Sequence, residues 1–351
     1  MSQLSRRGLL GVLAASPVVA LAACGGQSQA QPGAGGATSG GTPSGTITVY
    51  NAQHENLGKA WADGFTKATG VKVEMRQGSD TEMSNQLLKE ADRSPADVFL
   101  TENSPAMVQV ANAGLFAPVD AKVTGNVPAN LRPASGAWTG IAARATVFAY
   151  NPTKIPEADL PKSLLDLADP KWNGRWGASP TGADFQAIVS ALLQLKGNQA
   201  TADWLKAMKT GSKPYKGNST AMKAVNNGEV DGAVIYHYYW FGDQAKTKEN
   251  SNNVKLHYFR NQDPGAFVSV SGGGVLKSSK NQPAANAFLD YITSTDGQAA
   301  LASSGFEYAV NPQAKLAAGL VPIADLQPPT IDIDKLNGGE VTKLMTAAGL
   351  V

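Results

Sequence analysis

Segments typical of β-strands alternate with segments typical of amphipathic helices over residues 46–114. Residues 46–50 alternate polar and apolar side chains, which predicts a strand, and residues 57–69 follow the helical period up to Gly70. This helix carries large apolar residues four positions apart on one face: Leu57, Trp61 and Phe65. Alternating strands and helices predict an α/β fold whose sheet is covered on both sides.

The same alternation continues further along the chain, which predicts a second α/β unit. Further strands are expected over 71–75, 96–100, 145–150, 174–178, 231–235 and 267–276, and further helices over 81–91, 105–114, 161–167, 200–208, 219–226, 283–294, 297–303 and 341–350. A length of 351 residues also fits two domains or lobes. Ligands of such sheets bind beyond the carboxyl ends of the strands, and His54 and Glu102 both fall there.

The N-terminal part reads as an export signal followed by a tether. Residues 1–23 combine Arg6 and Arg7 with a short apolar stretch, which is typical of a signal peptide. Cys24 is the only cysteine, and it follows Leu-Ala-Ala in a pattern that resembles the lipobox of bacterial lipoproteins. We therefore expect a lipid on Cys24, with an ordinary buried thiol as the alternative. The composition of residues 24–45, rich in Gly, Ser, Gln, Ala, Thr and Pro, predicts a disordered tether.

The charge of the chain excludes some classes of partner. Charged residues make up 17% of the sequence, and the formal net charge of +2 becomes zero once Arg6 and Arg7 are removed with the signal peptide. A balanced charge gives no reason to expect nucleic acid or a strongly charged macromolecule as the partner.

Aromatic residues gather directly after the predicted strand 231–235. Consecutive residues of a strand point to opposite faces, so Tyr238 and Tyr239 can meet one ligand only if the strand ends near His237 and a helix follows. Phenolate oxygens are hard, charged ligands that suit ferric iron, and a histidine and a carboxylate would complete the set. Each phenolate formed at neutral pH releases a proton, so binding should weaken in acid.

A structural interpretation of the same residues stays open. Tyrosines at strand ends are often core or rim aromatics whose hydroxyls bind the backbone. In this interpretation, His54 is a structural histidine and Glu102 is a carboxylate favoured near the start of a helix.

Five motifs taken in order resemble those of the ferric-iron-binding proteins of bacterial ABC importers. They are Tyr-Asn-Ala-Gln-His-Glu at 50–55, Arg-Gln-Gly-Ser-Asp at 76–80, Arg-Ser-Pro-Ala-Asp-Val-Phe-Leu-Thr-Glu-Asn-Ser-Pro at 93–105, Pro-Thr-Gly-Ala-Asp-Phe-Gln at 180–186 and His-Tyr-Tyr-Trp at 237–240. The match covers residues 46–311, and the ordered set is far more specific than any single motif.

The resemblance implies an α/β fold of the two-lobed periplasmic-binding-protein type (type II), with the ligand in the cleft between the lobes. Lobe 1 would comprise residues 46–143 with about 269–320. Lobe 2 would comprise residues 144–268 with about 321–351. Strands that cross between the lobes would let them close over the ion.

The resemblance also implies the ligands of Fe(III). Carried over by motif, they are His54, Glu102, Tyr238 and Tyr239. The family holds a synergistic anion, phosphate or carbonate, beside the ion. A loop before a helix offers free backbone N–H groups to an anion, and the residues matched to this role are Thr181, Gly182, Ala183, Asn218 and Arg144.

Two points of the implied site stay open. Arg144 is alternatively a solvated or ion-paired strand residue. Many members of the family have asparagine near the position where this chain has Tyr236 and His237, which leaves the anion and the full ligand set undecided.

The implied function is an extracytoplasmic receptor that captures Fe(III) and hands it to an ABC permease with its ATPase. The receptor is expected to be a monomer attached to the cell membrane through Cys24. An alternative is a receptor for an organic or oxyanion solute that uses the same cleft without iron. We do not expect an enzyme, because the sequence has no nucleophile elbow, Walker loop, dinucleotide fingerprint or metalloprotease helix.

Overall fold

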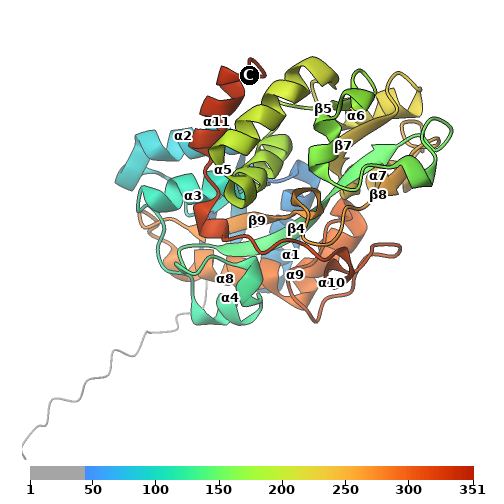
Figure 1. Ribbon diagram of the computed structural model, residues 1–351. Helices are drawn as coiled ribbons and strands as arrows, with labels where there is room; N and C mark the ends of the chain where they lie inside the picture. Colours follow the sequence, from blue (N-terminus) through green and yellow to red (C-terminus); the bar gives the residue numbers. More distant parts are fainter. Residues whose placement is uncertain (1–43) are drawn as a thin grey trace, which may run out of the picture. The chain divides into compact units, whose positions relative to one another are not determined.

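Strand β4 (Thr139–Tyr150) joins the two halves of a nine-stranded sheet and crosses the middle of the molecule in Figure 1. Its first part, up to Ala145, pairs with β9 (Val268–Val275), and its last part, from Thr146, pairs with β7 (Gly232–Tyr236). All of its residues are buried. The two sheet halves therefore meet on one continuous strand, between Ala145 and Thr146.

The computed structural model describes residues 44–351, apart from the side chain of Ser304. The strands of the first sheet half lie in the order β2-β1-β3-β9-β4, with β1 (Thr46–Asn51), β2 (Lys72–Gln77) and β3 (Val98–Leu100) parallel to one another. The second half continues as β4-β7-β5-β6, with β5 (Trp176–Ala178), β6 (Ser212–Pro214) and β8 (Lys255–His257), which pairs with β4.

Helices cover the sheet as the alternating sequence pattern predicts. The α-helices are α1 (Glu55–Thr69), α2 (Asp80–Glu90), α3 (Ser104–Asn112), α4 (Ala121–Gly125), α5 (Ala183–Gly211), α6 (Asn218–Asn226), α7 (His237–Gln244), α8 (Gln282–Thr293), α9 (Thr295–Ala300), α10 (Ile323–Leu326) and α11 (Gly338–Ala347). The short 3-10 helices are η1 (Ala91–Arg93), η2 (Ala129–Leu131), η3 (Glu157–Asp159), η4 (Leu164–Ala168), η5 (Pro170–Trp172), η6 (Pro264–Ala266) and η8 (Ile333–Lys335), and η7 (Leu301–Gly305) is a π-helix.

Helix α1 shows how the sequence pattern becomes packing. Leu57, Trp61 and Phe65 are fully buried in one core cluster with residues of β1, β3 and α8. The helix ends at Gly70, whose φ of 79° is a left-handed conformation that glycine adopts without steric cost. Burial of this face fixes α1, and with it the segment that carries His54.

Some expected boundaries differ from the structure. The expected strand 145–150 is only the last part of β4. The residues before it are mostly small and have weak strand propensity, so the sequence did not predict them as strand. Helix α3 begins at Ser104, whose hydroxyl donates to the carbonyl of Val270. The expected helix 161–167 is the 3-10 helix η4. The sequence also predicts a long helix that follows residues 180–185 and runs through 195, and this helix and the one expected over 200–208 form one kinked α5, with φ 78° at Gly197.

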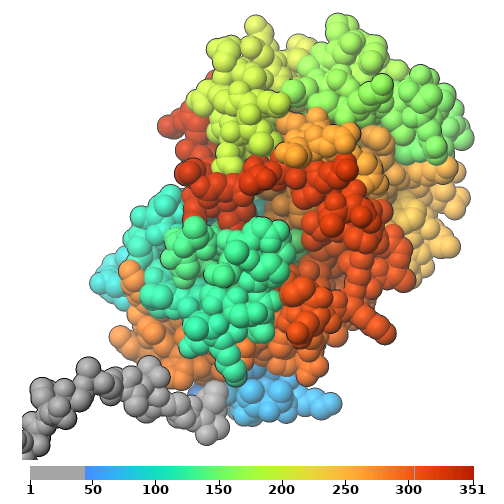
Figure 2. Space-filling model, turned by 60° about the horizontal axis from the view of Figure 1, so that its bottom comes forward, coloured from blue at the N-terminus to red at the C-terminus, as the bar shows by residue number. Residues whose placement is uncertain are grey.

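The C-terminal segment lies against both sheet halves. Asp332 exchanges hydrogen bonds with Gln194 of α5, and Asp334 accepts from the backbone and hydroxyl of Ser135. Figure 2 shows this segment, in red, between α5 in yellow-green and the green residues around 130. Helix α11 packs on α5, so the chain ends on the second sheet half.

The predicted signal peptide 1–23, the lipid site Cys24 and nearly all of the tether 24–45 lie outside the described residues. Among the residues that the structure describes, no helix is long and apolar enough to cross a membrane.

Replacement of Phe65 by alanine tests the importance of the α1 face. Removal of a fully buried ring leaves a cavity, so we expect the free energy of unfolding to fall by about 3–5 kcal/mol. Urea unfolding followed by circular dichroism measures the change. Lys67→Ala, on the exposed face of the same helix, is the control, and equal losses in both variants would contradict the assignment of the core face.

Candidate metal centre

His54 and Glu102 lie together at the carboxyl ends of two neighbouring parallel strands. His54 follows β1 and Glu102 follows β3, and these strands pair directly. His54 Nδ1 lies 3.0 Å from Glu102 Oε1. The Gln53 side chain accepts from the backbone N–H of His54 at 2.8 Å, which fixes this turn. The expectation that the two side chains share one sheet edge is confirmed.

The two ring nitrogens of His54 differ in their surroundings. Its Nε2 is buried without a hydrogen-bond partner among the described residues. Burial lowers the pKa of His54, so the ring is neutral near pH 7. Because Nδ1 lies beside Glu102 Oε1, Nε2 is the ring nitrogen that remains for a cation.

Tyr238 and Tyr239 converge because the strand stops before them. Strand β7 ends at Tyr236 and α7 begins at His237, so both tyrosines lie in the first helical turn. Their rings stack with centroids 4.3 Å apart. The Tyr238 ring also packs edge-on against His54 at 5.1 Å. The structural condition for a shared ligand, stated above from the sequence, is met.

Asp184 accepts hydrogen bonds from both tyrosines, and the sequence did not identify it as a site residue. It lies in the first turn of α5 and is 4% exposed. Its Oδ2 accepts from the Tyr238 hydroxyl at 3.1 Å and from the Tyr239 hydroxyl at 3.0 Å. Asn218 Nδ2 donates to the same oxygen at 2.8 Å, and Asn103 Nδ2 donates to Oδ1 at 2.9 Å.

Of the residues expected to bind an anion, Asn218 contacts the Asp184 carboxylate, and the other loop residues directly precede Asp184 in the chain. Gly182 precedes α5 and Ala183 begins it, directly before Asp184, while the Thr181 carbonyl accepts from Gln186. Asn218 begins α6 and bonds Asp184. The signal for Asp184 was present in its motif, as a carboxylate near the N-terminus of a long helix, where negative charge is favoured.

Arg144 is fully buried on β4 and is ion-paired rather than solvated. Its Nε and Nη2 bind Glu307 Oε2, and Nη2 also donates to Ser271 Oγ at 2.6 Å. Its Nη1 lies 3.9 Å from Asp184 Oδ1. The ion-paired alternative for Arg144 therefore matches its contacts.

Burial favours the protonated forms of the two phenols and of Glu102. It raises the pKa of Tyr238 and Tyr239 well above the ordinary value, and the Asp184 carboxylate raises both further. Burial and Asp184 also raise the pKa of Glu102. A trivalent cation reverses this penalty, because it supplies the opposite charge and displaces the protons.

The side chains of Tyr236 and His237 bind backbone groups next to the site. Tyr236 donates to the backbone carbonyl of Asp184 at 3.3 Å. His237 is buried between Ala145 and Phe306, with Nδ1 accepting from the Ala145 N–H at 3.1 Å and Nε2 lying 2.9 Å from the Phe306 carbonyl. Both of its nitrogens face backbone groups, so His237 has a structural role at the junction of the sheet halves.

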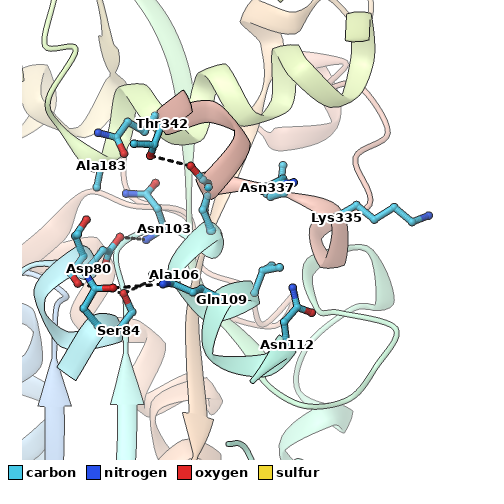
Figure 3. Close-up of a pocket in the computed structure, with 18 of the residues that line it drawn as sticks. Asp80, Ser84, Asn103, Ala106, Gln109, Asn112, Ala183, Lys335, Asn337 and Thr342 are labelled. Carbon is cyan, nitrogen blue, oxygen red and sulfur yellow. Dashed lines mark hydrogen bonds between the residues drawn. The ribbon is translucent and has the colours of Figure 1, made fainter. Parts of the chain in front are cut away.

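Two cavities lie near the cluster. One of about 560 Å³ is lined by His54, Tyr238 and Tyr239 and gives access to the candidate ligands. The other, of about 780 Å³, is shown in Figure 3 and is lined by Asp80, Asn103 and the C-terminal segment, but by none of the four predicted ligands. We therefore place the site at the smaller cavity, because the chemistry lies there.

Asp80 lines the larger cavity and fixes the backbone at Glu102. Its carboxylate accepts from the backbone N–H of Glu102 at 2.9 Å and from that of Asn103 at 3.0 Å. Burial raises its pKa to about 7. Among the described residues, no group of three or more His, Cys, Asp or Glu side chains is arranged for a metal, so the candidate site depends on the phenols.

The fold and the site fit a ligand-binding protein, and the comparisons give its class. Residues 93–333 match the model of a family described as "Bacterial extracellular solute-binding protein". The chain belongs to this family. The match and the similar structures below confirm the predicted two-lobed α/β fold class.

The similar proteins specify the branch of the family. The chain is 63% identical over 306 residues to the "Fe(3+)-binding periplasmic protein" of Serratia marcescens, covering 87% of this chain and 90% of that protein. It is 38% identical to the "Major ferric iron-binding protein" of Neisseria meningitidis serogroup B, covering 87% and 93%. Iron-bound HitA from Pseudomonas aeruginosa superimposes with a TM-score of 0.82 at 44% identity, covering 87% and 99%. The resemblance to ferric-iron-binding proteins is thereby confirmed.

Proposed function

We propose that this protein captures Fe(III) outside the cytoplasm and delivers it to an ABC permease. The observation that carries the proposal is the convergence of Tyr238 and Tyr239 on the Asp184 carboxylate, next to His54 and Glu102. Hard oxygen ligands with one imidazole suit ferric iron. The names of the similar proteins from Serratia and Neisseria support the same cargo.

The proposed ligands are His54 Nε2, the carboxylates of Glu102 and Asp184, and the phenolates of Tyr238 and Tyr239. The two phenolates and two carboxylates carry four negative charges, one more than the three positive charges of the ion, so charge balance requires no added anion. We therefore propose that Asp184 supplies the negative charge for which the family resemblance implied phosphate or carbonate. Asn218 would hold the Asp184 carboxylate in place through its side-chain amide.

Closure over the ion would be a movement of two lobes. We propose lobe 1 as residues 46–143 with about 269–320 and lobe 2 as 144–268 with about 321–351. The change of pairing partner along β4, between Ala145 and Thr146, supports a hinge at this boundary. Because His54 and Glu102 come from one sheet half and the tyrosines from the other, the full ligand set requires the closed form.

The delivery step would use the permease membrane subunits with their ATPase. We propose that the receptor acts as a monomer, without catalytic activity, and that a lipid on Cys24 keeps it at the membrane. The family of extracellular solute-binding proteins supports the extracytoplasmic location and the importer.

The alternative of an organic or oxyanion receptor has less support. An anion bound between His54 and the tyrosines would lie near the carboxylates that contact these residues, Glu102 and Asp184. Arg144, the cation expected to bind it, already pairs with Glu307. Calorimetry with phosphate in iron-free buffer distinguishes the two functions, because the alternative requires binding under these conditions.

The double variant Tyr238→Phe with Tyr239→Phe should lose the visible tyrosinate-to-iron charge-transfer band. Phenylalanine keeps the ring packing and removes both oxygens, and with them the two hydrogen bonds to Asp184. The visible spectrum and the iron content after exposure to ferric citrate measure the effect. Tyr215→Phe is the control, since that ring lies outside the cluster, and a band that survives in the double variant would contradict the proposal.

Iron binding should weaken as the pH falls. Both phenol pKa values are raised, so binding releases protons and is favoured at higher pH. We expect the apparent binding constant to drop about tenfold per pH unit for each proton released, between about pH 8 and pH 5. Competition with citrate at several pH values measures the slope, and a flat profile would exclude phenolate ligation.

Asp184→Asn should lower the affinity for Fe(III) by about 100-fold or more, because an amide cannot replace the carboxylate charge. Wild-type protein should bind iron equally well with and without added phosphate. Asp203→Asn, at an exposed position of the same helix, should behave as wild type. Wild-type binding that requires phosphate or carbonate would instead favour the synergistic anion predicted from the sequence.

A further inference from the structure

The segment that precedes Glu307 has an unusual backbone conformation. The π-helix η7 precedes Glu307, and Phe306 adopts φ 54° and ψ 26°, a left-handed conformation that is uncommon outside glycine. The Phe306 carbonyl accepts from His237, and the backbone of Tyr308 exchanges two hydrogen bonds with Ala143. Strain of this kind persists only where the surroundings fix it, and it gathers at functional sites.

The Glu307 carboxylate forms an ion pair with Arg144. Glu307 is 1% exposed, and its Oε2 binds Arg144 through both Nε and Nη2. Its Oε1 has no hydrogen-bond partner among the described residues. Glu307 thus neutralises a guanidinium that is itself completely buried.

Arg144 has a second carboxylate within reach. Its Nη1 has no hydrogen-bond partner among the described residues and lies 3.9 Å from Asp184 Oδ1, too far for a hydrogen bond. The guanidinium carbon also lies 5.4 Å from the centroid of the Tyr238 ring. Asp184 and Glu307 are therefore placed to compete for one buried cation.

Resting on the proposed iron site, we propose that Glu307 is a positioning residue that holds Arg144 away from Asp184 and leaves the Asp184 carboxylate to Fe(III). A buried guanidinium without a carboxylate is strongly destabilised, so it takes the nearest one. Without the charge of Glu307, the nearest carboxylate is that of Asp184. A bond to Arg144 would draw Asp184 out of its place between the two phenols.

This role differs from simple support of the fold. If Glu307 only stabilised the protein, its loss would lower the melting temperature and leave iron affinity unchanged in the folded fraction. If Arg144 were instead needed to hold an anion beside the ion, removal of Arg144 would cost affinity under every condition. The proposal predicts neither result.

Glu307→Gln tests the inference, because it keeps the size of the side chain and removes the charge. We expect the affinity for Fe(III), measured by citrate competition, to fall about 10–100-fold, with a shifted charge-transfer band. Arg144→Met combined with Glu307→Gln removes the competing cation and should recover affinity to within about fivefold of wild type. Glu74→Gln, an exposed glutamate on β2, is the matched control.

The double variant keeps the test decisive even if Glu307→Gln alone does not fold. Loss of iron binding in the double variant to the level of Asp184→Asn would overturn the inference, as would a Glu307→Gln variant that binds like wild type. Wild-type protein that shows no charge-transfer band would instead contradict the iron site itself. The two failures are therefore distinguishable.

Discussion

The shared hydrogen bonding of Tyr238 and Tyr239 to one oxygen of Asp184 is the interaction on which the site depends. It brings two phenol hydroxyls and a carboxylate together in a buried place, where burial and the charge of Asp184 raise the pKa of both phenols. Such an arrangement holds protons until a cation of high charge displaces them. Affinity for Fe(III) and sensitivity to acid then share one physical origin.

The junction on β4 connects this chemistry to movement. Arg144 and Ala145 end the part of β4 that pairs with β9, and the next residue begins the pairing with β7. His237 binds the Ala145 N–H and directly precedes the two tyrosines. A change of angle at this junction would move the tyrosines relative to His54, so the proposed lobe closure would also complete the proposed ligand set.

Much of this arrangement was predictable from the sequence, and the exceptions have physical reasons. The spacing of Leu57, Trp61 and Phe65 predicted α1 and its buried face, because helical periodicity is a local property. The sequence predicted that the tyrosines can meet one ligand only if the strand ends near His237, because propensity alone does not locate the end of a strand. Asp184 and Glu307 were missed, because their partners lie far away in sequence and one charged residue carries no periodic signal.

The most direct test of the central claim is the position of the ion in crystals grown with ferric iron, located by anomalous scattering at the iron absorption edge. The account predicts one strong peak bounded by the oxygens of Tyr238, Tyr239 and Asp184, with His54 Nε2 and the Glu102 carboxylate on the opposite side. A peak in the cavity lined by Asp80 and the C-terminal segment, or none between the two phenols, would contradict it.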